Sequence, residues 1–79
     1  MDDKVYIDFG LALITLKNGG RVARKGWNGK GIYVELNKGL DYSFSILNPF
    51  LVIKNVNNSH STWVPSINDC LAEDWYIHD

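Results

Sequence analysis

The sequence predicts an α+β fold: a small antiparallel β-sheet with an N-terminal α-helix and a short C-terminal helix. Two observations carry this prediction. An apolar stripe with helical spacing lies near the N-terminus, and the extended segments that follow it are short and separated by turn residues. A chain of 79 residues has room for one domain with a small core, so we assign residues 1–79 to a single domain.

The first predicted element is a helix that begins after Asp8, a favourable N-cap residue. Lys17 lies in its last turn, and Asn18-Gly19-Gly20 is a typical helix end. The main apolar stripe has the spacing i, i+3, i+4, i+7 and consists of Phe9, Ala12, Leu13 and Leu16. Leu11 and Ile14 lie off this stripe. The helix therefore has a second apolar side, for which a subunit interface is one candidate.

A β-hairpin is predicted next. Residues 21–24 form a short first strand, and Ile32-Tyr33-Val34-Glu35-Leu36 alternates and contains β-branched residues, as strands do. Asn28-Gly29 lies between them and is typical of a type I′ turn. The two strands are therefore expected to pair in antiparallel fashion.

The remaining elements are shorter. Residues 37–48 are interpreted as a polar loop with scattered aromatic residues, and the ring of Pro49 disfavours helix just before it. After this loop the sequence predicts a buried strand at 50–54, an extended segment at 62–64, a helix at 67–72 capped by Ser66, and a last strand at 75–77.

Charge is distributed unevenly along a chain whose formal net charge is −1. A stretch without acids carries Lys17, Arg21, Arg24, Lys25 and Lys30, whereas the C-terminal stretch without Lys or Arg carries Asp69, Glu73, Asp74 and Asp79. Either the two regions neutralise each other in the fold, or the basic stretch meets an anion. The net charge gives no global attraction to nucleic acid or to a membrane.

Cys70 is the one cysteine, so no intrachain disulfide braces the fold, and we interpret it as a small core residue. The acidic start of the chain and the lack of an apolar run of about 20 residues lead us to expect a cytoplasmic protein. Because the core of so short a chain is marginal, we also expect a homo-oligomer.

No catalytic or metal pattern stands out. His60 and His78 are interpreted as solvated surface histidines, and two His with one Cys at wide spacing give no zinc pattern. Asp69, Glu73 and Asp74 are interpreted as a solvated acidic face. The sequence therefore predicts no enzyme, no metal and no cofactor.

The strongest candidate for a binding site is the loop from Lys25 to Gly31. Its glycines allow tight turns and present backbone N–H groups, while Trp27 offers a flat face between cations. These features suit a ligand with phosphates and an aromatic base. The alternative is a plain hairpin loop with Trp27 packed in the core. Gly10 has two interpretations as well: close packing of the helix start against a strand, or close approach of a ligand.

Three segments together carry a family resemblance. They are Phe9-Gly10-x-Ala12-Leu13-x-x-Leu16, then Val22-Ala23-Arg24-Lys25-Gly26-Trp27-Asn28-Gly29-Lys30-Gly31, then Ala72-x-Asp74-Trp75. In these motifs the chain resembles small phage and prophage proteins of the Thoeris anti-defence type 2 family. The resemblance runs from about Tyr6 to Ile77, although residues 37–62 contribute little to it.

The resemblance implies a sponge, which binds a cyclic ADP-ribose-type signal made by a TIR enzyme of a bacterial defence system and withholds it from its effector. It also implies a homotetramer with pockets between subunits and, in some members, a separate site for cyclic di- or trinucleotides. The implied ligand-binding residues are Phe9, Gly10, Arg24, Trp27, Asn28, Gly29, Asp74 and Trp75.

Within this set the resemblance and side-chain chemistry together suggest individual roles. Trp27 and Trp75 would form two walls around the ligand, the alternative for each being a place in the hydrophobic core, and Arg24 would pair with a phosphate. Asn28 would read a base edge or ribose, and Asp74 would accept ribose hydroxyls or an amino group.

Other classes of function stay open at this point. One is a binding module for another nucleotide, and another is a protein that inhibits a defence enzyme by direct contact. A single-stranded nucleic-acid platform is disfavoured by the acidic C-terminus, so no nucleic-acid polymer and no membrane are expected as partners.

Overall fold

The computed structural model describes residues 4–27, 31–39, 41–42, 45–46 and 48–78, with backbone alone at 41–42 and 45–46. In chain order the elements are α1 (Phe9–Lys17), β1 (Arg21–Arg24), β2 (Tyr33–Asn37), β3 (Asp41–Tyr42), β4 (Ser45–Ile46), β5 (Phe50–Lys54), β6 (His60–Thr62), α2 (Ile67–Leu71) and β7 (Trp75–His78). This is the α+β class that the sequence predicts.

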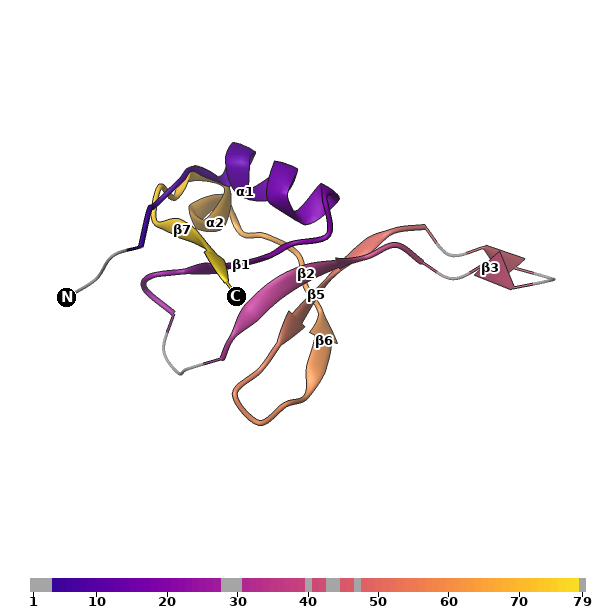
Figure 1. The fold of residues 1–79 in the computed structure, drawn as a ribbon. Helices are drawn as coiled ribbons and strands as arrows, with labels where there is room; N and C mark the ends of the chain where they lie inside the picture. The colour runs from indigo at the N-terminus through magenta and orange to yellow at the C-terminus, as the bar shows by residue number, and fades with distance from the viewer. Residues whose placement is uncertain (1–3, 28–30, 40, 43–44, 47, 79) are drawn as a thin grey trace.

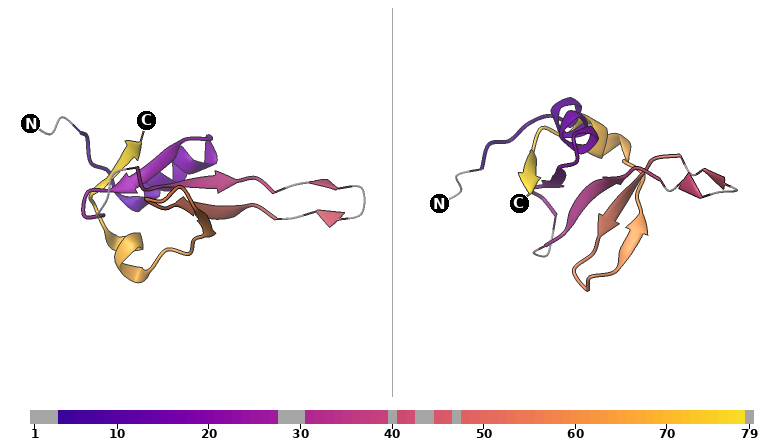
Figure 2. Two further views of the ribbon diagram at one scale, coloured as in Figure 1. Left: turned by 90° about the horizontal axis from the view of Figure 1, so that it is seen from below. Right: turned by 45° about the vertical axis from the view of Figure 1, so that its right-hand side comes forward.

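Five of the strands form one antiparallel sheet in the order β6-β5-β2-β1-β7. Both helices lie side by side on the same side of this sheet (Figure 1), as a turned view also shows (Figure 2). We call this the helix side and the opposite surface the open side. The described residues place no helix over the open side.

The core lies between the helices and the sheet. Its fully buried residues come from α1, from the middle strands and from β7: Ala12, Leu16, Val22, Val34 and Trp75. Val22 pairs with Val34, and Val34 pairs with Ile53, so three neighbouring strands present aliphatic side chains to the core on the helix side. The apolar stripe of the helix therefore meets a matching row of strand residues.

The N-terminal helix has the predicted bounds and caps. The Asp8 carboxylate accepts a hydrogen bond from the Leu11 N–H at 2.9 Å. At the other end Gly19 has a φ of +88°, a left-handed conformation that glycine adopts without strain. The second apolar side is exposed, with Leu11 51% and Ile14 55% accessible.

Strands β1 and β2 pair in antiparallel fashion, which confirms the predicted hairpin. Asn28 and Gly29, the predicted type I′ turn, lie outside the described residues. The predicted strand at 50–54 is found with the same bounds, and the last strand is one residue longer than expected.

The predicted loop at 37–48 is wrong in one respect. Beyond the sheet, β2 and β5 continue into the pair β3 and β4, which projects away from the rest of the domain (Figure 1). Each of these strands has two residues, so neither contains the alternation from which a strand is predicted. The extended segment predicted at 62–64 is shifted toward the N-terminus, since β6 covers 60–62.

The second helix is a single short turn stabilised at its start. Ser66 and Asp69 form a capping box, in which the Asp69 N–H donates to Oγ of Ser66 and the Ser66 N–H donates to the Asp69 carboxylate. Cys70 is exposed here, so its interpretation as a core residue is wrong. None of the helices formed by the described residues has the length and apolar character of a membrane span.

Candidate functional site

Trp75 is the centre of an aromatic cluster on the helix side. Its side chain is fully buried, and its indole N–H donates to the Asp69 carbonyl oxygen at 2.9 Å. Phe9 packs against it with ring centroids 5.3 Å apart. A buried indole with a satisfied N–H is a stable anchor for neighbouring rings.

Trp27 and Trp63 pack against Trp75 on the side that faces the surface. Their centroids lie 5.4 Å and 6.0 Å from that of Trp75, both in edge-to-face geometry. They also meet each other edge-to-face at 6.2 Å. Both indoles are half-buried, so each contacts the core on one side and remains accessible on the other.

The turn that carries Trp27 is held by carboxylates from the end of the chain. Arg24 donates from Nε to Asp74 and from Nη1 to Asp69, both at 2.9 Å. The other Asp74 carboxylate oxygen accepts from the Gly26 N–H at 3.3 Å, and the Asp74 carbonyl oxygen accepts from the Lys25 N–H at 3.0 Å. Asp69 and Asp74 thus fix both the guanidinium of Arg24 and the backbone before Trp27.

The charges in this clamp stabilise one another. Hydrogen bonding to Asp74 raises the pKa of Arg24, burial lowers it, and hydrogen bonding to Asp69 raises it further, so that the net shift is upward. Burial alone would raise the pKa of Asp69, but hydrogen bonds from Ser66 and Arg24 outweigh it and lower the pKa. Arg24 and Asp69 are therefore both charged at neutral pH.

Beside the clamp lies a cavity of about 380 Å³, which we call the tryptophan cavity. The lining comes from the connection between β1 and β2, from the end of β5 and the residue after it, from the residue after β6 and from α2: Gly26, Trp27, Ile32, Ile53, Asn55, Trp63 and Asp69. A volume of this size is at the lower end of small-molecule sites. Its wall combines two indoles with an amide and a carboxylate.

The sequence-predicted site residues are distributed around this cavity. Trp27 lines it, Arg24 and Asp74 form the clamp next to it, and Trp75 lies behind it in the core. Phe9 is half-buried against Trp75. Asn28 and Gly29 lie outside the described residues.

Gly10 is exposed at the start of α1. Of the residues that the structure describes outside its own helix and its chain neighbours, a Cβ at this position would come within 4 Å of the Asp8 side chain alone. The interpretation that Gly10 packs closely against a strand is therefore wrong.

Three cavity residues and one further residue of the clamp were missed or misread from the sequence. Trp63 and Asn55 were interpreted as parts of an extended segment and a loop, although an indole close to a loop rich in Asn and Ser is a usable signal. Asp69 and Asp74 were interpreted as a solvated face, which is wrong because both bind Arg24. Of the two alternatives for the charge distribution, neutralisation within the fold is what the structure shows at Arg24.

The histidines differ from each other. His60 is exposed as predicted, whereas His78 is half-buried with its ring 5.0 Å from that of Tyr33, so its interpretation as a solvated histidine is wrong. Among the described residues no group of three or more His, Cys, Asp or Glu is placed to hold a metal ion.

Fold and site together define a small α+β domain whose helix side carries an aromatic cavity held in place by an arginine–carboxylate clamp. A family model described as a Thoeris anti-defense 2-like domain matches residues 7–78. The protein named Thoeris anti-defense 2 of Bacillus phage SP01 is 37% identical over 86 residues, an alignment covering 94% of this chain and 97% of that protein. The chain belongs to the Thoeris anti-defense 2-like family. This confirms the resemblance that its motifs predict. The general role that the family indicates is counteraction of Thoeris defence.

Proposed function

We propose that the protein is a phage anti-defence sponge that binds a TIR-generated cyclic ADP-ribose-type nucleotide and sequesters it without cleaving it. The observation that carries the proposal is the tryptophan cavity, since its wall joins two accessible indoles to polar groups in a chain of this family. Indole faces suit an adenine base, because a base has a flat π-face that stacks favourably on an aromatic side chain.

The cavity suggests one change in the predicted roles. Trp75 has no exposed surface, so it supports the site from behind, and Trp63 takes the place of the second wall beside Trp27. Asn55 donates from Nδ2 to the hydroxyls of Ser59 and Ser61, at 3.1 Å and 3.4 Å. Its Oδ1 is therefore the atom we assign to accept from an amino group of the base.

The clamp supplies groups for the sugar and phosphate part of the ligand. Arg24 is bonded to carboxylates through Nε and Nη1, and we assign its phosphate contact to Nη2. Asp74 is assigned to ribose hydroxyls, since within the described part of the chain its Oδ2 has one weak partner, the Gly26 N–H at 3.3 Å. Phe9, Gly10, Asn28 and Gly29 remain proposed ligand residues on the strength of the resemblance.

The proposal requires that the ligand leaves the protein unchanged. To test this, the protein is incubated with cyclic ADP-ribose isomers, separated from free ligand, heat-denatured, and the supernatant analysed by chromatography. We expect the intact isomer to be recovered in proportion to the protein. Recovery of a hydrolysed product would contradict the sponge, and capture of a different nucleotide from a mixed panel would support the alternative of another binding module.

We further propose that the protein assembles into a homotetramer in the host cytoplasm. The two helices pack against each other and carry exposed apolar side chains, namely Leu11, Ile14, Ile67 and Leu71. Burial of such side chains between subunits would add to a small core. Light scattering at low micromolar concentration should give the mass of a tetramer, and Leu11→Ser should lower that mass. A monomeric wild-type protein would contradict the assembly.

A further inference from the structure

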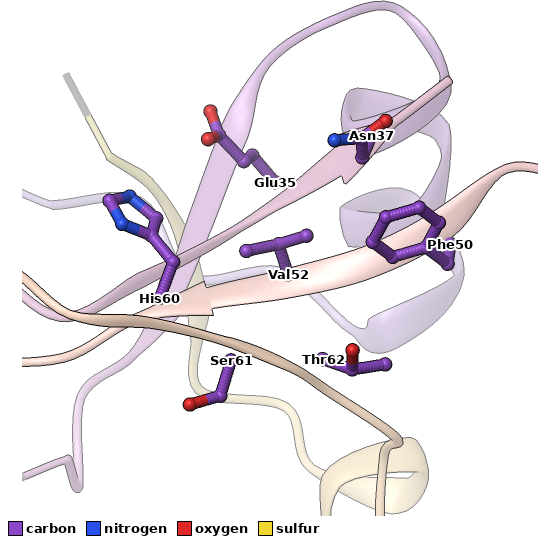
Figure 3. Close-up of a pocket in the computed structure, with 7 residues that line it drawn as sticks. All are labelled: Glu35, Asn37, Phe50, Val52, His60, Ser61 and Thr62. Atoms are coloured by element: carbon purple, nitrogen blue, oxygen red, sulfur yellow. The ribbon is translucent and has the colours of Figure 1, made fainter. Parts of the chain in front are cut away.

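The open side of the sheet carries a second cavity, of about 330 Å³, that the proposed function does not use (Figure 3). We call it the open-side cavity. It extends over β2, β5 and β6, and its lining on this side consists of Glu35, Asn37, Phe50, Val52, His60 and Thr62. Its residues belong to regular strands, so their backbone positions are fixed by the sheet.

Strand register explains how these side chains come together. Glu35 pairs with Val52, and Val52 pairs with Thr62, so these residues form one row across three strands. Asn37 pairs with Phe50 in the next row on the same side. Figure 3 shows Val52 in the middle, with Phe50 toward one end and His60 toward the other.

The polar groups of the cavity include both hydrogen-bond donors and hydrogen-bond acceptors. The Oδ1 of Asn37 accepts from the Gly39 N–H at 2.9 Å, which leaves the Nδ2 of Asn37 to donate. The Glu35 carboxylate lies 3.6 Å from Nε of Arg21, too far for a hydrogen bond, so both oxygens keep their capacity to accept. Thr62 adds a hydroxyl that both donates and accepts.

The apolar groups give the cavity a floor and an end wall. Val52 lies between Glu35 and Thr62, which are two strand spacings apart, or about 10 Å. Phe50 is half-buried and presents part of a flat ring beside Asn37. A ring-shaped ligand with polar edges and an apolar face matches this arrangement.

We propose that the open-side cavity binds a sugar ring through a vicinal diol, with the Glu35 carboxylate accepting from two adjacent hydroxyls. A carboxylate accepts from sugar hydroxyls in other proteins, as in the acidic residue that binds the ribose of dinucleotides. Glu35 lines the cavity whereas its neighbour Arg21 does not, so an anionic group beside this carboxylate would meet a like charge and a neutral donor is favoured. The Phe50 ring covers the C–H face of the sugar, and Asn37 donates to a ring or hydroxyl oxygen.

The diol has two possible sources, a free monosaccharide or the ribose of a nucleoside. Titrations of ¹⁵N-labelled protein are followed by amide shifts in NMR spectra, with methyl β-D-ribofuranoside and its 2-deoxy counterpart as probes. Adenosine and 2′-deoxyadenosine form a second pair. We expect shifts at the amides of β2, β5 and β6, and about tenfold weaker binding of each deoxy compound, equivalent to about 1.4 kcal/mol for a hydrogen bond to a charged group.

Substitutions test the assigned acceptor. Glu35→Gln should weaken the riboside about tenfold, whereas Glu73→Gln, which changes an exposed carboxylate outside this cavity, should not alter its affinity. Thr62→Val provides a second variant at the opposite flank, with an expected severalfold loss. Tighter binding of adenosine with the same dependence on the 2′-hydroxyl would identify a nucleoside as the source, and equal binding of riboside and adenosine a free sugar.

Other results would overturn the inference. They are equal affinity for ribo and deoxy probes, binding of adenine without a sugar at these strands, or unchanged affinity in Glu35→Gln. Shifts confined to Trp27 and Trp63 would also overturn it, while supporting a ligand at the tryptophan cavity. The two cavities lie on opposite sides of the sheet and share no lining residue, so each proposal fails or stands by itself.

Discussion

The two sides of the sheet use the same kinds of residue in different ways. On the helix side, Trp75 is buried beneath α1 and Arg24 is bonded to two carboxylates at 2.9 Å. On the open side, Tyr33 is covered by cations, with the Arg21 guanidinium 4.6 Å and the Lys54 ammonium 5.7 Å from its ring centroid. Aromatic rings and cations meet on both sides of the sheet. On the helix side Arg24 is held by two carboxylates, whereas on the open side the cations over Tyr33 are the ends of long side chains near solvent.

The difference shows where preorganisation comes from. Trp27 is positioned because its turn is bonded to Asp74 and its ring leans on a buried indole. Arg21 has a carboxylate neighbour at 3.6 Å, and both side chains of that pair are more than a third exposed. Solvent screens such a pair, so it holds little in place. We therefore expect a rigid cavity on the helix side and an adaptable surface on the open side.

The largest expected effect is a difference in unfolding free energy between substitutions of an aromatic residue on the two sides of the sheet. Trp75→Ala should lower the free energy of unfolding by about 3–5 kcal/mol, because it leaves a cavity in the core. Phe50→Ala is the matched change on the open side, and since this ring is half-buried it should cost about 1 kcal/mol. Urea unfolding followed by circular dichroism measures both. Similar losses in the two variants would break the comparison.

A second pair of variants compares the cations. Arg24→Met should cost about 2–4 kcal/mol of unfolding free energy, because Asp69 and Asp74 lose their shared partner while half-buried. Arg21→Met removes an exposed pair and should cost less than about 1 kcal/mol. The same urea titrations provide the measurement, and a small loss in Arg24→Met would show that the clamp does not stabilise the turn.

The smallest expected effect is a loss of stability in acid. The folded-state pKa of Asp69 is lowered from an ordinary value of 3.8, so its contribution is complete above that value and declines as the pH falls through the folded pKa. Wild-type protein should therefore lose more unfolding free energy between pH 5 and pH 3 than Asp69→Asn does. Equal pH dependence in the two proteins would contradict this role of Asp69.

Local patterns predicted the elements better than the site. The helix after Asp8, the paired hairpin strands and the strand at 50–54 follow from caps and periodicity, which act over a few residues. The partners of Arg24 are 45 and 50 residues away, so no local pattern reveals them. The contact of Trp63 with Trp27 could not be predicted for the same reason, because it depends on the pairing of β5 with β6.

Motifs indicated the right part of the molecule without the arrangement within it. Trp27 was predicted as a wall and lines the cavity, while Trp75, from an equally prominent motif, is buried behind it. Two tryptophans beside acidic or glycine residues look alike in a sequence. Burial, which depends on the packing of α1 over the sheet, distinguishes them.

The most direct test of the account is the affinity of Trp27→Ala for cyclic ADP-ribose isomers, measured by calorimetric titration together with its melting temperature. Loss of one aromatic stack should weaken binding about 5- to 150-fold, or about 1–3 kcal/mol. Because Trp27 is half-buried, the melting temperature should fall by about 5–10 °C and leave the variant folded at 25 °C. Trp27→Phe, which keeps a flat ring, should recover part of the affinity. A folded Trp27→Ala protein that binds the nucleotide as tightly as wild type would contradict the assignment of this cavity as the ligand site.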